Sequence, residues 1–412
     1  MTIKSVVIIG GGASGWWTAG YLEKNVPGLD ITLIESQEVP RIGVGESTVP
    51  AIKTFFDSMG IEEKDWLDKS YGIRKLGNFK QGWNSPNDDG LAFTFWYNYG
   101  NQFDSWVKDY FAGKKTKQQI NDDLYRPNSW ASYSYHIDAE SSAYVVKNMC
   151  KNVKHIVTTI DNKLQLPPAD LYVDCTGLGR KFVKDHEELE LQHHLVDSCI
   201  VCPFERDDEP KLYTHTKSIA RPYGWEFQID LQHRMGVGYC YSSKFVSDRD
   251  ALEHYTDLHQ HQKTWNNSKP RVIKWKPSVL KNPWTHNTVA IGLSAGFVDP
   301  LEANALFLTQ MQITALARSI NRGLTAEAYN RLCRQVQKQN SDYILHHYAL
   351  ARRNDTEFWR YYKNIDVKKS LWENYKNKNS TKLDSYPDSI YATLGLYFDE
   401  FTYYKPKEIS NE

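Results

Sequence analysis

Several classes of protein are excluded by what this 412-residue chain has little of. Its six cysteines are too few for a disulfide scaffold of this size. Lys and Arg together number 50, as do Asp and Glu, so the formal net charge is zero and nucleic acid is not an expected partner. No apolar stretch approaches the ~20 residues that cross a bilayer. The first predicted strand leaves no room for a signal peptide. We therefore expect a cytoplasmic protein without a membrane partner.

Metal binding is not expected either. Cys199 and Cys202 form one Cys-x-x-Cys pair, but no second pair lies at the spacing of a zinc site, so we interpret the pair as strand packing. His254, His259 and His261 cluster in polar surroundings that lack partners at ligand spacing. We interpret them as a solvated helix face.

Aromatic residues, by contrast, are abundant, with 13 Trp and 26 Tyr. Aromatic side chains bury large areas and form flat-sided pockets for planar ligands, although most of them are expected in the core. Residues 84–130 are rich in Asn, Asp and aromatics without a sustained period. This segment is predicted to be an insertion that forms a lid or a substrate wall.

A dinucleotide-binding fingerprint opens the chain. The β-branched run at residues 6–9 leads into Gly10-x-Gly12-x-x-Gly15, a pattern typical of a strand that turns tightly into a helix holding a pyrophosphate. A second predicted strand ends at Glu35, 20 residues past Gly15, at the offset of an acid that binds an adenosine ribose. The residues predicted to hold the nucleotide half are Gly10, Gly12, Ala13, Ser14, Gly15 and Glu35.

The remaining pattern predicts a mixed α/β chain. Strands are expected at 6–9, 31–35, 171–175, 225–230, 235–241 and 288–291, the fourth and fifth as an antiparallel pair. Helices are expected at about 14–25, 51–59, 132–150 and 302–348, the last broken at 323–325, where Thr325 is the predicted N-cap. Residues 355–412 are expected to form packed helices and loops.

The fingerprint alone does not separate nicotinamide from flavin. A second element, in which a strand ends at Gly292 and Asp299-Pro300 precedes a helix, places another helix N-terminus near the cofactor. Flavin enzymes of the monooxygenase type use such a helix beside the ribityl chain and the isoalloxazine ring. The strand at 171–175, followed by Thr176-Gly177, fits a crossing of the adenine half. FAD is therefore favoured over NAD.

Several motifs carry a resemblance to one family. They comprise residues 10–15, Arg41-Ile-Gly-Val-Gly-Glu-Ser-Thr-Val-Pro50, Asn78-Phe79-Lys80, residues 238–245, residues 292–302 and Asp355-Thr-Glu-Phe-Trp359. In this order they resemble flavin-dependent tryptophan halogenases over about residues 3–360, and the chain looks like a C-terminally shortened member. The resemblance implies a three-layer, Rossmann-like FAD-binding α/β domain of the flavin monooxygenase type, with an added β-sheet and a largely helical substrate lobe. We predict that residues 1–83 and 145–310 form the FAD-binding domain and that 84–144 and 311–412 form the substrate lobe.

The resemblance also implies a reaction. Reduced FAD from a separate NAD(P)H-dependent flavin reductase, dioxygen and a halide ion would generate hypohalous acid, which reaches Lys80 for electrophilic halogenation of an electron-rich aromatic substrate. Lys80 and Glu302 match the family's catalytic lysine and carboxylate. A buried neutral amine can become an N-halo species, whereas an ammonium can donate a hydrogen bond that polarises the oxidant. Glu302 could tune the lysine or accept the proton lost by the ring. The sequence leaves these alternatives open.

Further residues are assigned by the same resemblance. To the cofactor set it adds Arg41, Gly45, Glu46, Ser47, Thr48, Gly292, Asp299 and Pro300; the halide would bind at Asn304 and Ala305, and the substrate pocket would be lined by Phe79, Phe93, Phe95, Trp96, Trp225 and Phe227.

The chain departs from the family at three places. The family's Trp-x-Trp-x-Ile-Pro is here Trp225-x-Phe227-x-Ile229-Asp230, and Ser-Thr-Gly after the catalytic carboxylate is here Ala303-Asn304-Ala305. The segment 93–99 and the portion after about residue 359 differ most. We therefore expect substrates beyond free tryptophan, such as other indoles, phenols or anilines. Two alternatives to the halogenase are an FAD-dependent aromatic hydroxylase, favoured by the eroded Trp motif, and a silent flavin-binding protein. The retention of Lys80 and Glu302 argues against both. A homo-oligomer is compatible with the sequence.

Overall fold

The computed structural model describes residues 3–39, 43, 45–88, 90–94, 109, 112–115, 119, 133–189, 191–205, 214–262, 264–265 and 269–365, and the statements below concern these residues. Of the predicted site residues, Arg41, Phe95 and Trp96 lie outside them, and only the backbone of Phe93 is described.

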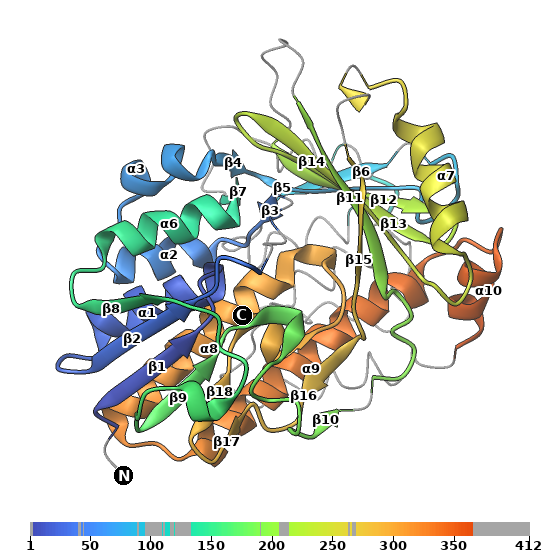
Figure 1. Cartoon of the computed structure of the whole chain (residues 1–412). Helices are drawn as coiled ribbons and strands as arrows, with labels where there is room; N and C mark the ends of the chain where they lie inside the picture. Colours follow the sequence, from blue (N-terminus) through green and yellow to red (C-terminus); the bar gives the residue numbers. More distant parts are fainter. Residues whose placement is uncertain are drawn as a thin grey trace, which may run out of the picture.

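A six-stranded sheet forms the base of the nucleotide-binding half, at lower left in Figure 1. The strand order is β17-β18-β9-β1-β2-β8, and every neighbouring pair except β17–β18 is parallel. Because carboxyl ends of parallel strands meet at one edge, Gly10, Cys175 and Gly292 come together there. The strands are β1 (Ser5–Ile9), β2 (Asp30–Glu35), β8 (Val153–Val157), β9 (Leu171–Asp174), β17 (Trp284–Thr285) and β18 (Thr288–Ala290).

Helices cover this sheet and bury one large apolar cluster against it. The cluster joins side chains of β1, β2 and β9 to side chains of five helices. These helices are α1 (Ala13–Asn25), α2 (Ala51–Ser58), α6 (Ala139–Met149), α8 (Asn304–Arg322) and α9 (Ala326–Leu350), with α3 (Glu63–Trp66) at the margin. The cluster includes Val145, Ile313 and Cys333, so segments predicted for the substrate lobe or at its boundary pack within the nucleotide-binding half.

A seven-stranded sheet lies above, at upper right in Figure 1, and is the added sheet that was expected. The strand order is β15-β11-β14-β13-β12-β5-β6, and only β12–β5 is parallel. One face packs against α7, and the other packs against the end of α9 and against α10. The elements are β5 (Gly77–Gln81), β6 (Leu91–Thr94), β11 (Ser198–Glu205), β12 (His215–Arg221), β13 (Gly224–Asp230), β14 (Arg234–Tyr241), β15 (Arg271–Lys274), α7 (Asp248–His259) and α10 (Glu357–Asn364).

Two three-stranded sheets and several 3-10 turns connect these layers. The order β3-β7-β4 comprises Glu46–Ser47, Ser134–Ile137 and Ile73–Lys75, and the order β10-β16-β19 comprises Glu188–Leu189, Ser278–Leu280 and Gly296–Phe297. The 3-10 turns are η1 (Asp68–Ser70), η2 (Lys163–Gln165), η3 (Gly177–Gly179), η5 (Gly292–Ser294) and η6 (Leu301–Ala303).

Most predicted elements are confirmed. The break between α8 and α9 falls at Gly323 (φ +62°), and the Thr325 side chain accepts a hydrogen bond from the Ala328 amide as an N-cap. Cys199 and Cys202 are buried in β11, as strand packing predicts. Beyond residue 355, the structure describes α10, and the remainder of the predicted tail (366–412) lies outside the described residues.

Two predictions were wrong. The helix expected from 132 starts at Ala139, because residues 134–137 pair instead with β3 and β4 as strand β7. His259 is not solvated: it is 4% exposed, and its Nε2 lies 3.1 Å from the carboxylate of Glu226 on the facing sheet. Its partner, distant in sequence, gave no local signal.

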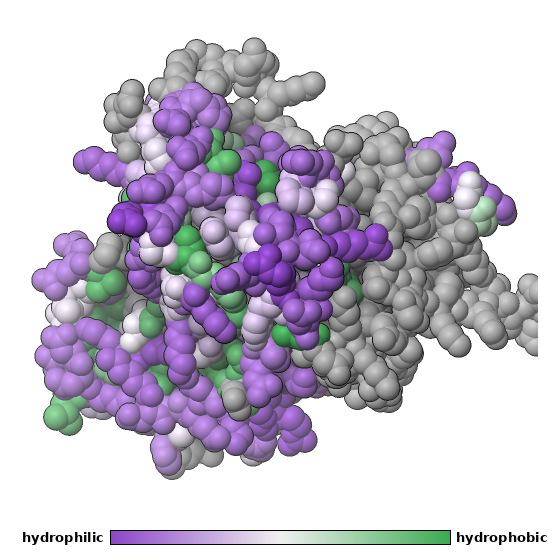
Figure 2. Space-filling view, turned by 90° about the vertical axis from the view of Figure 1, so that its right-hand side faces the viewer, coloured by the Kyte–Doolittle hydropathy of each residue, from purple (hydrophilic) through white to green (hydrophobic). Residues whose placement is uncertain are grey.

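The described part of one face of the molecule is largely polar (Figure 2). On the face shown in Figure 2, hydrophobic residues form only small separate areas among the described atoms. Among the helices in the described part of the chain, none is long and apolar enough to span a bilayer.

Candidate active site

Lys80 and Glu302 form a buried ion pair between Nζ and Oε1. Lys80 is 2% exposed, and alternation along β5 places Asn78 on the same face. The Asn78 amide donates to the second carboxylate oxygen of Glu302, Oε2, over 2.9 Å. The structure thus joins the two residues that the resemblance named, 222 positions apart, and adds Asn78, which the sequence analysis did not assign to the site although its i, i+2 spacing from Lys80 indicates a shared face.

The backbone that presents Glu302 is strained. Glu302 (φ +64°) and Ala303 (φ +60°) are consecutive non-glycine residues in the left-handed region. Such a conformation costs about 1–2 kcal/mol per residue and persists only where the surroundings impose it. The turn directs the carboxylate toward β5 immediately before α8 begins at Asn304.

Helix α9 closes the site from the other side. Tyr343 and His347, one helical turn apart, both reach Glu302: the Tyr343 hydroxyl donates to Oε2 over 3.3 Å, and His347 Nε2 lies 3.3 Å from Oε1. Burial acts to raise the pKa of Glu302, but the Lys80 charge and His347 outweigh it and hold that pKa well below its usual range. Glu302 is therefore a carboxylate at neutral pH. Sequence analysis missed both α9 residues, whose only signal is their i, i+4 spacing.

A second buried lysine is coupled to this pair. Lys75, at the end of β4, donates hydrogen bonds to Ser47 Oγ (2.7 Å) and to the Thr48 carbonyl (3.3 Å). Burial lowers the pKa of Lys75 to about 7; the charge of Glu302 opposes the shift and that of Lys80 adds to it. Two predicted cofactor residues thus bind this buried lysine, Ser47 through its side-chain hydroxyl and Thr48 through its backbone carbonyl.

Trp225 and Phe227 form an aromatic wall inside the apolar cluster beneath the seven-stranded sheet. The Trp225 indole donates to Asp299 Oδ1 over 3.1 Å, and the Tyr348 hydroxyl donates to Oδ2 over 2.5 Å. Burial raises the pKa of Asp299 to about 6, although both bonds work against the shift. The Asp299 carboxylate therefore holds the wall in place, and a direct contact with a cofactor remains a prediction.

The first glycine element has the shape that a dinucleotide requires. A Cβ added to Gly10 would lie 2.3 Å from the Cys175 carbonyl, whereas a Cβ on Gly12 would meet nothing within 4 Å. Gly12 is the N-cap of α1, which has no side-chain cap or acidic residue in its first turn among the described residues. Open space before an uncapped helix N-terminus fits a pyrophosphate.

Glu35 lies beside this cradle. A Cβ on Gly11 would clash with Glu35 Oε2, and Oε1 contacts Lys147 Nζ (3.0 Å) and His155 Nε2 (2.7 Å). Its position at the end of β2 is the predicted one, and its contacts with Lys147 and His155 were not foreseen.

The second glycine element packs against the first. A Cβ on Gly292 would lie 2.1 Å from Ser14 Oγ, and the Gly292 amide donates to Gln312 of α8 over 2.8 Å. Glu46 accepts a 2.8 Å bond from the amide of Ala139 at the start of α6, which ties the loop containing Gly45 to the same half. Pro300 precedes η6, and the predicted halide residues Asn304 and Ala305 open α8.

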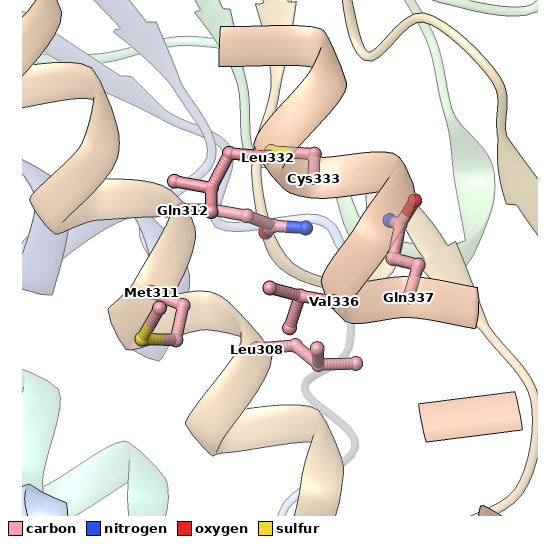
Figure 3. Close-up of a pocket in the computed structure, with 7 residues that line it drawn as sticks. All are labelled: Leu308, Met311, Gln312, Leu332, Cys333, Val336 and Gln337. Carbon is pink, nitrogen blue, oxygen red and sulfur yellow. The ribbon is translucent and has the colours of Figure 1, made fainter. Parts of the chain in front are cut away.

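The predicted substrate residues are only partly described. Phe79 alternates away from Lys80 and packs over Gly90, while the backbone of Phe93 pairs with Asn78. Figure 3 shows a separate apolar pocket between α8 and α9 that contains none of the predicted site residues. Its lining consists of Leu308, Met311, Gln312, Leu332, Cys333, Val336 and Gln337.

Comparison with known proteins agrees with this geometry. The sequence model described as Tryptophan halogenase matches residues 5–394, so the match runs past the limit expected near residue 360. The chain is 27% identical to tryptophan 7-halogenase KtzQ of Kutzneria sp. (strain 744), covering 98% of this chain and 85% of that protein. It is also 27% identical to tryptophan 7-halogenase RebH of Lentzea aerocolonigenes, covering 97% and 86%.

Solved structures share the fold. A tryptophan halogenase from Shewanella frigidimarina superposes with a TM-score of 0.83 at 26% identity, covering 96% of this chain and 89% of that chain. A flavin-dependent halogenase from Xanthomonas campestris gives the same TM-score at 24% identity, covering 97% and 89%. The hydroxylase alternative receives no support from these matches. The chain belongs to the tryptophan halogenase family and is an FADH2-dependent halogenase that uses halide and dioxygen.

Proposed function

We propose that Lys80 and Glu302 are the catalytic pair of this halogenase, acting at the end of a path that delivers hypohalous acid to an aromatic substrate. The observation that carries the proposal is the buried Lys80–Glu302 ion pair, enclosed by Asn78, Tyr343 and His347. Hypohalous acid reacts indiscriminately in water. A dry site in which Lys80 is the amine paired with Glu302 therefore gives the oxidant a defined acceptor, and the low pKa of Glu302 keeps its side chain in the carboxylate form.

FAD is held, in this proposal, by the two glycine elements. Gly12 at the N-terminus of α1 would hold the pyrophosphate, Glu35 would bind the adenosine ribose, and Gly292 would face the flavin half. Reduced FAD supplies the electrons with which dioxygen converts halide to hypohalous acid. The halide binds near the amides of Asn304 and Ala305 at the start of α8.

The aromatic wall separates these two halves of the reaction. Trp225 is fixed by Asp299, and Phe227 packs tightly over Gly238, where an added Cβ would lie 2.2 Å from the Phe227 ring. Both rings face the cluster that also contains Trp83 and Leu301, close to the catalytic pair. A rigid apolar wall keeps the organic substrate from the flavin while the small oxidant passes.

The substrate is an electron-rich arene. The relatives named above act on tryptophan, but the chain departs from the family at 93–99 and after about residue 359. We therefore propose that other indoles, phenols or anilines are accepted, with electrons arriving through a separate NAD(P)H-dependent flavin reductase.

Mass spectrometry of an arene panel tests this function. The purified protein is incubated with FAD, a flavin reductase, NADH and oxygen, with chloride, bromide or iodide in separate reactions. Halogenated products that disappear in Lys80→Ala support the proposal. Hydroxylated products that ignore halide and persist in Lys80→Ala would replace it with the hydroxylase, and turnover of free tryptophan alone would refute the broader substrate range.

A further inference from the structure

His347 makes two polar contacts, and both partners are hydrogen-bond acceptors. Its Nδ1 lies 2.9 Å from the carbonyl oxygen of Tyr343, and its Nε2 lies 3.3 Å from Oε1 of Glu302. The side chain is fully buried, so no solvent molecule substitutes for either partner.

A neutral imidazole cannot satisfy both contacts. It carries one N–H, so one ring nitrogen presents a lone pair to an acceptor. The Nε2–Oε1 contact is an ion-pair distance rather than a formed hydrogen bond, and a second proton on the ring would give each acceptor an N–H while Glu302 remains ionised. The position is therefore built to receive one proton.

Lys80 competes for that proton. Lys80 Nζ and His347 Nε2 both address Oε1 of Glu302, from opposite elements β5 and α9. One carboxylate balances one cation, and burial penalises an unbalanced second charge. Burial and the Lys80 charge lower the pKa of His347, whereas Glu302 opposes the shift. With Lys80 charged, His347 is neutral; with Lys80 neutral, the repulsion that keeps His347 neutral is gone.

We infer that His347 takes the proton of Lys80 through Glu302, which leaves Lys80 as the neutral amine that reacts with hypohalous acid. This inference rests on the proposed function and chooses the N-halo route over the hydrogen-bonding route. It makes His347 a positioning residue for the proton, since it touches Glu302 rather than the substrate.

The steps balance. Glu302 Oε1 accepts a proton from the Lys80 ammonium and passes it to His347 Nε2, giving a neutral amine and an imidazolium. The amine attacks the halogen of hypohalous acid; the N–X bond forms, the O–X bond breaks, and the displaced hydroxide combines with the proton lost from nitrogen as water. The arene then takes the halogen and its ring proton returns to the Lys80 nitrogen. The proton on His347 finally moves back through Glu302.

Other charged and titratable groups near this triad are few in the described structure. Lys75 interacts electrostatically with both Glu302 and Lys80, and the Tyr343 hydroxyl donates to Oε2 of Glu302. The ring of Trp83 contacts His347 edge-on, with centroids 6.1 Å apart, and carries no charge.

Nuclear magnetic resonance of histidine-labelled protein tests the coupling without FAD or halide. The His347 ring signal is assigned by its absence from His347→Gln, and its titration is followed in wild type and in Lys80→Met. Removal of the lysine charge is expected to raise the midpoint by at least about one pH unit, a tenfold change in proton affinity. An unchanged midpoint would overturn the inference even if the protein halogenates arenes.

The pH profile of halogenation gives a second readout. His347→Gln keeps a neutral polar side chain beside Glu302 but cannot hold a proton, so the rate should fall about tenfold or more near neutrality and recover as pH rises, when bulk base replaces the missing proton acceptor. His346→Gln is the matched control, because His346 is also buried and its Nδ1 contacts the Asp342 carbonyl at 3.0 Å. A loss in His347→Gln that is equal at every pH indicates a structural role and contradicts the inference. A wild type that never halogenates refutes the proposed function instead.

Discussion

The side-chain amide of Asn78 donates a 2.9 Å hydrogen bond to Oε2 of Glu302, two residues before the lysine that occupies Oε1. Asn78 therefore orients the carboxylate without competing for Oε1, the oxygen that contacts Lys80. A neutral donor is required at position 78, because a carboxylate there would lie beside the Glu302 carboxylate in a buried site.

Asn78→Asp should consequently damage catalysis more than Asn78→Ala. Two carboxylates within hydrogen-bond distance cannot both ionise at low cost, so the pKa of Glu302 rises and its pair with Lys80 weakens. We expect halogenation to fall at least about tenfold in the Asp variant, with FAD affinity unchanged. Steady-state rates and a flavin titration check this; equal rates for the Asp and Ala variants would contradict the assigned role of Asn78.

Gly12→Ala separates cofactor binding from folding. Nothing lies within 4 Å of an added Cβ at Gly12, so the free protein should keep its unfolding temperature. A methyl group in the pyrophosphate space should weaken FAD binding by about tenfold or more, since backbone approach to the phosphates is lost. Fluorescence titration measures the affinity. Unaltered affinity would place the pyrophosphate elsewhere.

The buried carboxylate of Glu226 should make the free energy of unfolding depend on pH in the acidic range. Burial would raise its pKa, but His259 and Arg221 lower it from 4.5 to about 2. The folded value is below the unfolded one, so the contribution is complete above about pH 4.5 and is lost as pH falls toward 2. Glu226→Gln should lower the free energy of unfolding by about 3 kcal/mol at pH 7, because it leaves the Arg221 guanidinium without the buried carboxylate that it pairs with.

Thermal unfolding between pH 3 and 7 measures the difference in stability between wild type and Glu226→Gln, and this difference should become smaller below pH 4.5. Glu253→Gln on the exposed face of α7 serves as the control, with an effect within about 0.5 kcal/mol. A stability difference that does not change with pH would show that the charge of Glu226 does not stabilise the folded state.

Asp299 should affect the pH dependence of stability in the direction opposite to that of Glu226. Burial raises its pKa from 3.8 to about 6, so the folded state binds the proton more tightly and stability falls as pH rises between these values. Asp299→Asn removes this penalty, and its unfolding temperature relative to wild type should be higher at pH 7 than at pH 4. The reverse trend would mean that the bonds from Trp225 and Tyr348 hold an ionised carboxylate.

The sequence predicted the parts of the fold that local pattern and spacing determine. The glycine fingerprint, the strand that ends at Glu35 and the Thr325 cap are short-range signals, and each lies where expected. Strand β7 was missed because its pairing with β3 and β4 is non-local, whereas Ser134–Ile137 runs directly into a helix.

The sequence indicated the two charged residues of the candidate site but not the α9 residues that surround them. The resemblance identified Lys80 and Glu302, and the structure joins them. Tyr343 and His347 could not be placed, because a polar i, i+4 pair on a helix is equally typical of a solvent-facing stripe. Only the crossing of α9 over η6 turns that pair toward Glu302.

The most direct test of the central claim measures oxidant and product together. Wild type and Lys80→Ala are supplied with FAD, flavin reductase, NADH, oxygen and halide, and both free hypohalous acid, caught by a small-molecule trap, and halogenated arene are quantified. We predict that Lys80→Ala still generates hypohalous acid at a rate near that of wild type but loses arene halogenation by at least about a hundredfold. Undiminished halogenation in Lys80→Ala would contradict the assignment of Lys80 as the group that transfers the halogen.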